Sequence, residues 1–337
     1  MVTLKMIAQH CGVSTATVSK ALNGATDINR DTALRVRQTA SKLGYLPNAA
    51  ARTLKTNRSL NFGVVIRDDS HFGLTHEFQA NVMEGFTQRA EELGYDVSFL
   101  TGRLGGKRMS FTEHARYRGC DGVLIMITTT SPELWELIDS GIPVVLIDHQ
   151  REGCGSVCSD NAKGTADLVR HVYERGCRRI AFIHGEDMAL TRRRIEGFYA
   201  ACRELGLEVP PEYVRGAIYR DAATNAAATR SLMALPQPPD CILYPDDMAF
   251  VGGRDALEAM GLSIPGDVAA VGYDGTNLSQ MLQPKLTTVY QDTKRMGACA
   301  AEELVRMATG GAGYRPQEFL IPGTLLPGGT VGERKPV

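Results

Sequence analysis

Residues 3–54 read TLKMIAQHCGVSTATVSKALNGATDINRDTALRVRQTASKLGYLPNAAARTL, and this stretch decides the fold of the N-terminal part of the chain. Its apolar residues recur at helical spacing in three short segments, which follow Thr3, Ser14 and Asn29, all of them residues that commonly cap helices. Gly12 permits a sharp turn between the first two segments. Two short helices joined by a glycine turn form a helix-turn-helix, whose second helix enters the major groove of DNA.

Charge divides the chain at the same place. Residues 1–58 hold nine Lys or Arg and only two acidic residues, a net charge of +7. The whole chain has 37 basic and 38 acidic residues, so the remainder has 28 basic and 36 acidic residues, a net charge of −8. A basic head on an acidic body predicts that the head binds phosphate groups and that the body does not.

The same residues carry a family resemblance. The segments GVSTATVSKALNG at 12–24 and LGYLPNAAARTLKT at 43–56 resemble the lactose-repressor/galactose-repressor family of bacterial transcriptional regulators, and the similarity extends over essentially the whole chain. The resemblance implies an α/β protein with two doubly wound parallel-sheet lobes, similar to periplasmic binding proteins. An all-α helix-turn-helix head precedes the two lobes.

The resemblance also implies a set of DNA contacts. In the family the recognition helix begins at the positions that match residues 14–20, and Lys20 falls where members contact either base edges or phosphate. Residues 47–55 match a hinge helix that pairs with its copy in the minor groove, where Leu54 matches a leucine that wedges between base pairs. We expect these residues to contact DNA: Thr3, Ser14, Thr15, Ala16, Thr17, Ser19, Lys20, Asn23, Asn48, Ala51, Arg52, Leu54 and Lys55.

From residue 60 the chain alternates short apolar strands with helical segments, in two successive runs. This alternation predicts two doubly wound parallel sheets, and ligands bind such sheets at the carboxyl ends of the strands. By resemblance the chain divides into these parts: a helix-turn-helix head at 1–46, a hinge helix and linker at 47–59, an N-terminal lobe at 60–160 plus 291–321, a C-terminal lobe at 161–290 and a C-terminal tail at 322–337.

Several polar residues follow predicted strands, where a cleft between the lobes is expected. Arg194 lies in RRRIEGF, which matches a family motif whose arginine binds effector oxygens, whereas Arg192 and Arg193 are expected to be solvated. Tyr219 has two equal interpretations, stacking on a sugar ring or packing between lobes. We expect these residues to bind the effector: Asp68, His71, Phe72, Asp148, Arg194, Tyr219, Asp246, Asp274 and Gln291.

The residues expected in the cleft are rich in hydrogen-bond acceptors. Asp246 stands where the family commonly has Asn, and Gly275 stands where it has an acid, so two positions depart from the family pattern. An excess of acceptors suits a neutral polyol or sugar and argues against a multiply phosphorylated ligand. No Walker-A pattern, nucleophile elbow or zinc-ligand spacing occurs, so we expect neither an enzyme, a cofactor nor a metal site.

These observations predict a homodimeric repressor of the bacterial cytoplasm, associated with the nucleoid. It would bind a near-palindromic double-stranded DNA operator, with an affinity switched by a small molecule, most simply a sugar. Two alternatives stay open for the same kind of regulator, a purine corepressor and control by a phosphocarrier protein. A free sugar-binding protein is a distant alternative, which the basic head and the lack of a signal peptide oppose. The apolar runs are too short for a membrane span.

Overall fold

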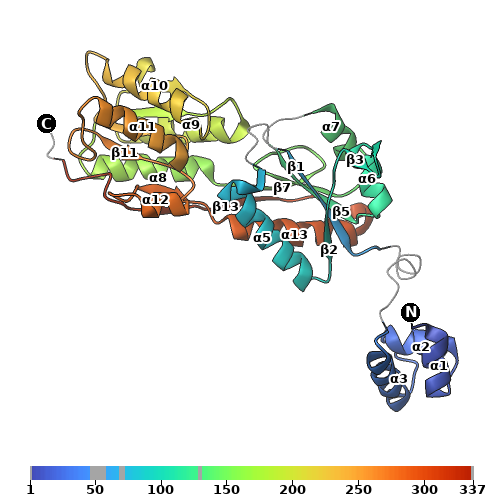
Figure 1. The fold of residues 1–337 in the computed structure, drawn as a ribbon. Coiled ribbons are helices and arrows are strands. Elements are labelled where there is room, and N and C mark those ends of the chain that lie inside the picture. The colour runs from blue at the N-terminus through green and yellow to red at the C-terminus, as the bar shows by residue number, and fades with distance from the viewer. Residues whose placement is uncertain (1, 46–57, 68–72, 128–130, 335–337) are drawn as a thin grey trace. The chain divides into compact units, whose positions relative to one another are not determined.

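The computed structural model describes residues 2–45, 58–67, 73–127 and 131–334 (Figure 1). Two compact units, residues 1–59 and 60–337, are described separately below as the head and the body. Within the described residues, no helix combines the length and the apolar character that a bilayer crossing requires. Eight of the predicted binding residues lie outside the described residues: Asn48, Ala51, Arg52, Leu54, Lys55, Asp68, His71 and Phe72.

The head contains three helices within residues 2–45. They are α1 (Leu4–Cys11), α2 (Thr15–Leu22) and α3 (Arg30–Leu43). A side-chain oxygen of the residue before each helix accepts a backbone N–H of its first turn, as the sequence predicts for Thr3, Ser14 and Asn29. Gly12 has a φ of 62°, a left-handed conformation that ends α1 only three residues before α2 begins.

A small apolar core sets the orientation of α2 in the head. Ile7 of α1, Val18 of α2 and Val36 of α3 are fully buried against one another, with further apolar residues around them. Fully burying a side chain of this size contributes about 1.5–3 kcal/mol. Because Val18 faces this core, the opposite face of α2 is directed away from the other two helices.

The first lobe of the body is built on a six-stranded parallel sheet with strand order β13-β7-β6-β5-β1-β2. Its strands are β1 (Asn61–Arg67), β2 (Asp96–Phe99), β5 (Gly122–Ile127), β6 (Val144–Ile147), β7 (Gly155–Ser159) and β13 (Glu318–Ile321). One face is covered by α5 (Glu77–Glu92) and α13 (Thr293–Thr309), which lie side by side in Figure 1. The other face is covered by α6 (Phe111–Arg118) and α7 (Pro132–Ile138).

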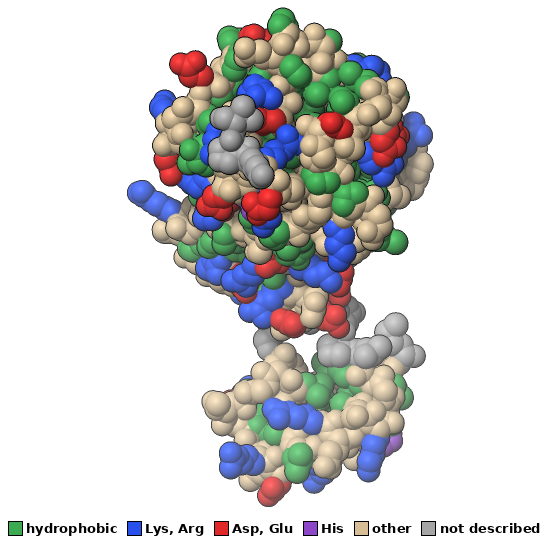
Figure 2. Space-filling view, turned by 90° about the vertical axis from the view of Figure 1, so that its left-hand side faces the viewer, with side chains coloured by type: hydrophobic (Ala, Val, Ile, Leu, Met, Phe, Trp, Pro, Cys, Tyr) green, Lys and Arg blue, Asp and Glu red, His purple; other side chains and the backbone are tan. Residues whose placement is uncertain are grey.

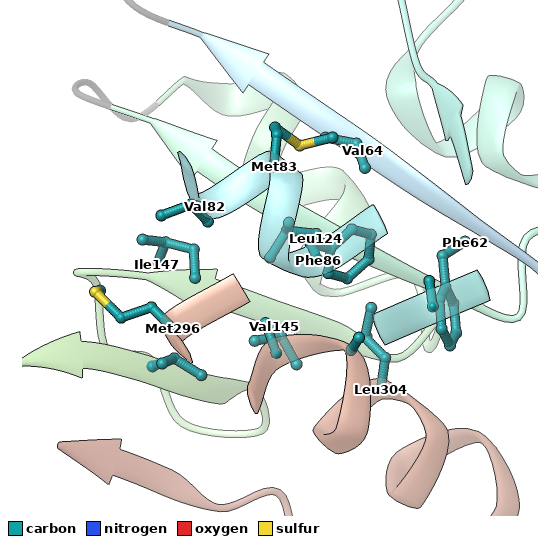
Figure 3. Packing of buried hydrophobic residues seen from close by; sticks show 14 of the residues in the cluster. Phe62, Val64, Val82, Met83, Phe86, Leu124, Val145, Ile147, Met296 and Leu304 are labelled. Atoms are coloured by element: carbon teal, nitrogen blue, oxygen red, sulfur yellow. The ribbon is translucent and has the colours of Figure 1, made fainter. Parts of the chain in front are cut away.

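The core of the first lobe joins segments that are distant in sequence. Figure 3 shows Phe86 of α5 and Leu304 of α13 among residues of the sheet, including Phe62 and Leu124. The strands are nearly continuous apolar runs because helices bury both faces of the sheet. Smaller elements complete the lobe: η1 (Gly73–Thr75) and the two-stranded hairpin β3 (Arg103–Leu104) and β4 (Lys107–Arg108).

The second lobe is built on a four-stranded parallel sheet with strand order β11-β10-β8-β9. Its strands are β8 (Ile180–His184), β9 (Val214–Gly216), β10 (Cys241–Leu243) and β11 (Ala269–Val271). One face is covered by α8 (Asn161–Glu174) and α9 (Ala189–Glu204), the other by α10 (Ala222–Met233) and α11 (Asp247–Ala259). Two short elements, η2 (Pro211–Tyr213) and α12 (Asn277–Met281), lie in its loops, and η3 (Gly311–Gly313) follows α13 of the first lobe.

The segment that we expected to be a C-terminal tail is instead packed into the body. Its strand β14 (Thr324–Leu326) pairs antiparallel with β12 (Thr288–Tyr290). Farther along, the side chain of Thr330 is fully buried and accepts the backbone N–H of Thr287 at 3.0 Å. Gly328 allows this close packing, because a Cβ at that position would collide with the backbone oxygen of Lys285.

Candidate functional site

The face of α2 that points away from the head core carries the predicted DNA-contacting side chains. Thr15, Ala16, Lys20 and Asn23 are exposed, whereas Val18 is buried. The remaining predicted contacts in the described head are the half-buried Thr17 and Ser19 and the exposed caps Thr3 and Ser14. Figure 2 shows Lys and Arg side chains over the visible face of the head. The outer face of α2 has the exposed side chains and the capped start that a major-groove contact requires.

Lys20 has a partner within the head that the sequence did not suggest. Its Nζ lies 2.5 Å from Oδ2 of Asp27, and both side chains are more than half exposed. The hydrogen bond and the charge of Lys20 hold the pKa of Asp27 below its ordinary value. Exposed ion pairs are weak, so phosphate or guanine acceptors can compete for Lys20. A DNA contact through Lys20 would therefore compete with the Asp27 carboxylate for the lysine's charge.

In the body, a cavity of about 490 Å³ is lined by residues from both lobes. This volume lies within the usual range for small-molecule sites. Its walls follow the carboxyl ends of β5, β6, β8 and β9, where parallel sheets place ligand-binding loops. The wall includes every predicted effector residue that the structure describes: Asp148, Arg194, Tyr219, Asp246, Asp274 and Gln291.

The Arg194 guanidinium is buried in the cavity wall and held by the protein itself. Its Nε donates to Oδ1 of Asn161 at 2.7 Å, and one terminal nitrogen donates to the backbone oxygen of Pro245 at 2.7 Å. The other terminal nitrogen lies 3.8 Å from Oδ1 of Asp274, and the group stacks 3.6 Å above the ring of Tyr273. These contacts position the guanidinium and occupy much of its donor capacity.

The two arginines before Arg194 differ from each other, although we expected both to be solvated. Arg192 is exposed and pairs with Asp187 at 2.7 Å within the second lobe. Arg193 instead reaches the first lobe, where it donates to Gln150 and lies 3.5 Å from the carboxylate of Glu318. The expectation is therefore wrong for Arg193, because a helix start that is solvated in isolation faces the neighbouring lobe here.

The neighbouring carboxylates of Asp246 and Asp247 have different partners. Asp246 caps α11 by accepting the backbone N–H of Ala249 at 2.7 Å, and its other carboxylate oxygen accepts the backbone N–H of Arg220, in the loop before α10, at 2.8 Å. Burial, together with the nearby Asp274 carboxylate, raises the pKa of Asp246 to about 6. Asp247 points toward α12 and β12 instead, and burial with the Asp274 carboxylate raises its pKa to about 8. Of the two, only Asp246 lines the cavity.

The remaining predicted residues of the cavity are also fixed by hydrogen bonds. Gln291 donates through Nε2 to Oδ1 of Asp274 at 2.7 Å. The hydroxyl of Tyr219 lies 2.8 Å from Oγ1 of Thr191, so this aromatic side chain is held from behind while it lines the cavity. The Asp148 carboxylate accepts the backbone N–H of Ser159 at 3.0 Å, and burial raises its pKa.

The sequence did not single out more than half of the described cavity lining. These residues are His76, Phe78, Gln79, Met126, Ile127, Ile147, His149, Glu186, Asp187, Met188, Leu190, Ile218 and Arg220. Most of them end a strand of the parallel sheets or follow one directly, so the rule that located Asp148 would have located them too. The other three, His76, Phe78 and Gln79, lie at the start of α5 instead. No local sequence pattern predicts that they line the cavity.

Both units resemble known protein families. The profile described as "Bacterial regulatory proteins, lacI family" matches residues 3–48, and the profile described as "Periplasmic binding protein-like domain" matches residues 169–331. The HTH-type transcriptional regulator CelR of Thermobifida fusca is 30% identical over 316 residues, which are 91% of this chain and 92% of that protein. The ribose operon repressor of Escherichia coli K12 is 29% identical over 317 residues, 92% of this chain and 94% of that protein.

A solved structure supports the same relationship. The complex of the transcriptional regulator CelR with cellobiose has a TM-score of 0.70 and 28% identity, and the match covers 98% of this chain and 100% of that one. The relatives named above are transcriptional regulators rather than enzymes. The helix-turn-helix head, the two parallel-sheet lobes and the full-length similarity agree with one another. This chain belongs to the lacI family of bacterial regulatory proteins.

Proposed function

We propose that the protein is a transcriptional repressor whose affinity for its operator is switched by a small hydroxylated molecule, a sugar, bound in the cavity between the lobes. The observation that carries the proposal is the pairing of two features in one chain. A capped, exposed recognition helix lies on a basic head, and a two-lobe cavity lined with hydrogen-bonding side chains lies in the body. An effector acts through the difference between its affinities for the two states of the repressor.

The details of the proposal follow the family relationship. Two copies of the chain form a homodimer on a near-palindromic operator in the bacterial cytoplasm, and residues 47–55 form the hinge helix there. The proposed effector contacts are the predicted residues that line the cavity, together with Asp68, His71 and Phe72, which lie outside the described residues. The other domain boundaries given above remain part of this proposal, whereas β14 and Thr330 belong to the body rather than to a separate tail. CelR is known in complex with cellobiose, which supports a carbohydrate as the effector class.

The direct test is selection of binding sites from random DNA by the purified full-length protein. We expect a near-palindromic sequence whose affinity falls steeply with salt, with a log–log slope of about −0.9 for each phosphate contact. Leu54→Ala should reduce bending of this operator, because the proposed wedge offsets the cost of unstacking. Failure to enrich any sequence would refute the repressor function.

The second test concerns control of the operator complex. A panel of sugars and purines is added to the protein–operator complex, and the DNA affinity is measured for each compound. A sugar that changes the affinity supports the proposed effector class. A purine that does so in place of every sugar, or a response only to an added phosphocarrier protein, would contradict it.

A further inference from the structure

We propose that the ligand of the cavity carries a protonated amine among its hydroxyl groups, as an amino sugar does. This inference rests on the proposed effector role of the cavity and narrows the class of effector. It follows from three features of the cavity wall: buried acceptors without partners, an excess of carboxylates and an arginine that the protein already occupies.

The first feature is the orientation of Gln291. Its Nε2 donates to the Asp274 carboxylate at 2.7 Å, and a carboxylate accepts but does not donate, so the amide cannot be flipped. Its Oε1 is therefore an acceptor, and this atom is buried without a hydrogen-bond partner. The side chain lines the cavity and only 2% of the residue is exposed. An unsatisfied buried acceptor is costly, so a ligand with a donor near this oxygen would be favoured over one without.

The neutral form of His149 presents a second acceptor. Its Nδ1 lies 2.9 Å from the backbone oxygen of Asp148, which only accepts, so Nδ1 carries a proton. In the neutral imidazole, Nε2 is then an acceptor, and this atom is buried without a partner. Oε1 of Gln79, a residue that is 6% exposed, is a third such acceptor in the wall. The three acceptors come from α5, the loop after β6 and the segment after β12.

The second feature is charge. The carboxylates of the wall outnumber its guanidinium groups, which belong to Arg194 and Arg220. The carboxylates are Asp148, Glu186, Asp187, Asp246 and Asp274. Asp187 pairs with Arg192 outside the cavity lining, which leaves four carboxylates facing two guanidinium groups. Burial raises the pKa of Asp148, and it raises the pKa of Asp246 to about 6, so a positive charge on the ligand would favour the ionised form of both carboxylates.

The third feature is the state of Arg194. Its donors are directed to Asn161 and Pro245, and its charge lies 3.8 Å from Asp274. The donors and the charge of Arg194 are therefore already used by groups of the protein, and little is left to attract an anionic ligand. An ammonium group has three donors and no acceptor, so it suits a wall rich in acceptors and offsets the charge of the ionised carboxylates. A hydroxyl group of the ligand can donate to an acceptor but does not compensate the negative charge of the carboxylates.

The lining also suits a cation in a second respect. The aromatic residues Phe78 and Tyr219 line the cavity, and aromatic faces attract ammonium groups. A carboxylated or phosphorylated ligand would instead meet carboxylates and acceptor atoms across most of the wall, which is unfavourable for it.

The test uses the full-length protein and matched sugars. The probes are glucosamine, galactosamine, mannosamine and the disaccharide of glucosamine, each compared with its neutral counterpart (glucose, galactose, mannose or cellobiose) and with its N-acetylated form. Thermal shift ranks the compounds and calorimetry gives their affinities. We expect at least one amine to bind at least about tenfold more tightly than its neutral counterpart, equivalent to about 1.4 kcal/mol, and N-acetylation to remove this preference. The inference is overturned if no amine binds, or if the neutral sugars bind equally well or better.

A charge variant locates the preference in the cavity. Asp246→Asn removes one carboxylate from the wall but retains a residue suited to capping α11. We expect the preference for the amine to fall several-fold in this variant and to persist in Asp255→Asn, which removes an exposed carboxylate of the same helix outside the cavity lining. Equal preference in both variants overturns the assignment to the cavity. If Asp246→Asn does not fold, the comparison of sugars on the unaltered protein still tests whether the protein prefers an amine.

The same measurements separate this inference from the proposed function. If neutral sugars alter operator affinity and amines do not, the inference fails while the repressor function stands. If no operator can be selected, the repressor function fails, yet the preference of the cavity for the amine is still measured by calorimetry.

Discussion

Both carboxylate oxygens of Glu77 accept the backbone N–H of Asn277, at 3.1 and 3.2 Å. Glu77 is the first residue of α5 in the first lobe, and Asn277 is the first residue of α12 in the second lobe. Thr276 does not cap α12 with its own side chain, because its hydroxyl donates to Asp247 at 2.8 Å. One lobe thus supplies the acceptor for the first N–H of a helix in the other, and the bond links the lobes beside the cavity.

Glu77→Ala should weaken the link between the lobes. The lost hydrogen bond to a charged group contributes about 0.5–1.5 kcal/mol when it is partly exposed, so amide exchange at residues 277–279 should accelerate several-fold. Hydrogen exchange of the full-length protein measures this. Glu84→Ala is the control, because Glu84 lies on the same helix and pairs with Lys294 within the first lobe at 2.6 Å. Equal acceleration in both variants would show that the Glu77 carboxylate does not link the lobes.

Asp27→Asn should strengthen DNA binding at low salt. The substitution removes a negative charge from the head and releases Lys20, so affinity should rise several-fold and the salt slope should become steeper by up to about 0.9. Titrations of the full-length protein with DNA at several salt concentrations test this. Asp31→Asn removes the same charge from the head but does not release Lys20. If the two variants gain equally, the Lys20–Asp27 pair does not limit DNA binding.

Arg194→Ala should destabilise the body as well as alter its cavity. The change leaves the Asn161 and Pro245 oxygens without their donor and the Asp274 carboxylate without its nearest positive charge. Breaking a buried pair in this way costs about 3–5 kcal/mol. Arg192→Ala, on the exposed side of the same helix, should change stability by no more than about 0.5 kcal/mol. Urea unfolding of the two variants is the measurement, and similar midpoints would contradict the structural role of Arg194.

Asp246→Asn should alter the pH dependence of stability. The pKa of Asp246 is raised from 3.8 to about 6 in the folded protein, so the folded state holds the proton more tightly than the unfolded state does. Stability is therefore lost as pH rises from about 4 to above 6, by as much as about 3 kcal/mol. Asn has no such ionisation, so the stability of the variant relative to the unaltered protein should rise by about 1 kcal/mol between pH of about 5 and about 8.

Unfolding free energies of the two proteins across this pH range provide the comparison. Asp247 ionises in both proteins, so its contribution cancels in the difference. Asp255→Asn, which alters an exposed carboxylate, should show no such trend. A difference between Asp246→Asn and the unaltered protein that is constant across the pH range would rule out the raised pKa.

The caps and turns of the head could be predicted because their signals act within a few residues. The side chains of Thr3, Ser14 and Asn29 bond to N–H groups two or three residues ahead, and Gly12 acts through its own backbone. The strands of the body could be predicted for a similar reason, because burial on both faces requires continuous apolar runs. Parallel sheets bind ligands at the carboxyl ends of their strands, and this rule predicted that Asp148 and the other residues that follow strands line the cavity.

Tertiary structure alone decided which partners these side chains have. Lys20 and Asp27 lie on either side of a turn, Arg193 reaches a strand that follows it by more than a hundred residues, and β14 returns to pair with β12. Whether Gln291 has a free acceptor depends on the Asp274 carboxylate, which lies seventeen residues away in sequence. The local preference of residues for helix, strand or turn does not predict such contacts. These contacts form only when folding brings separate segments of the chain together. Packing then determines which charged and polar groups face one another.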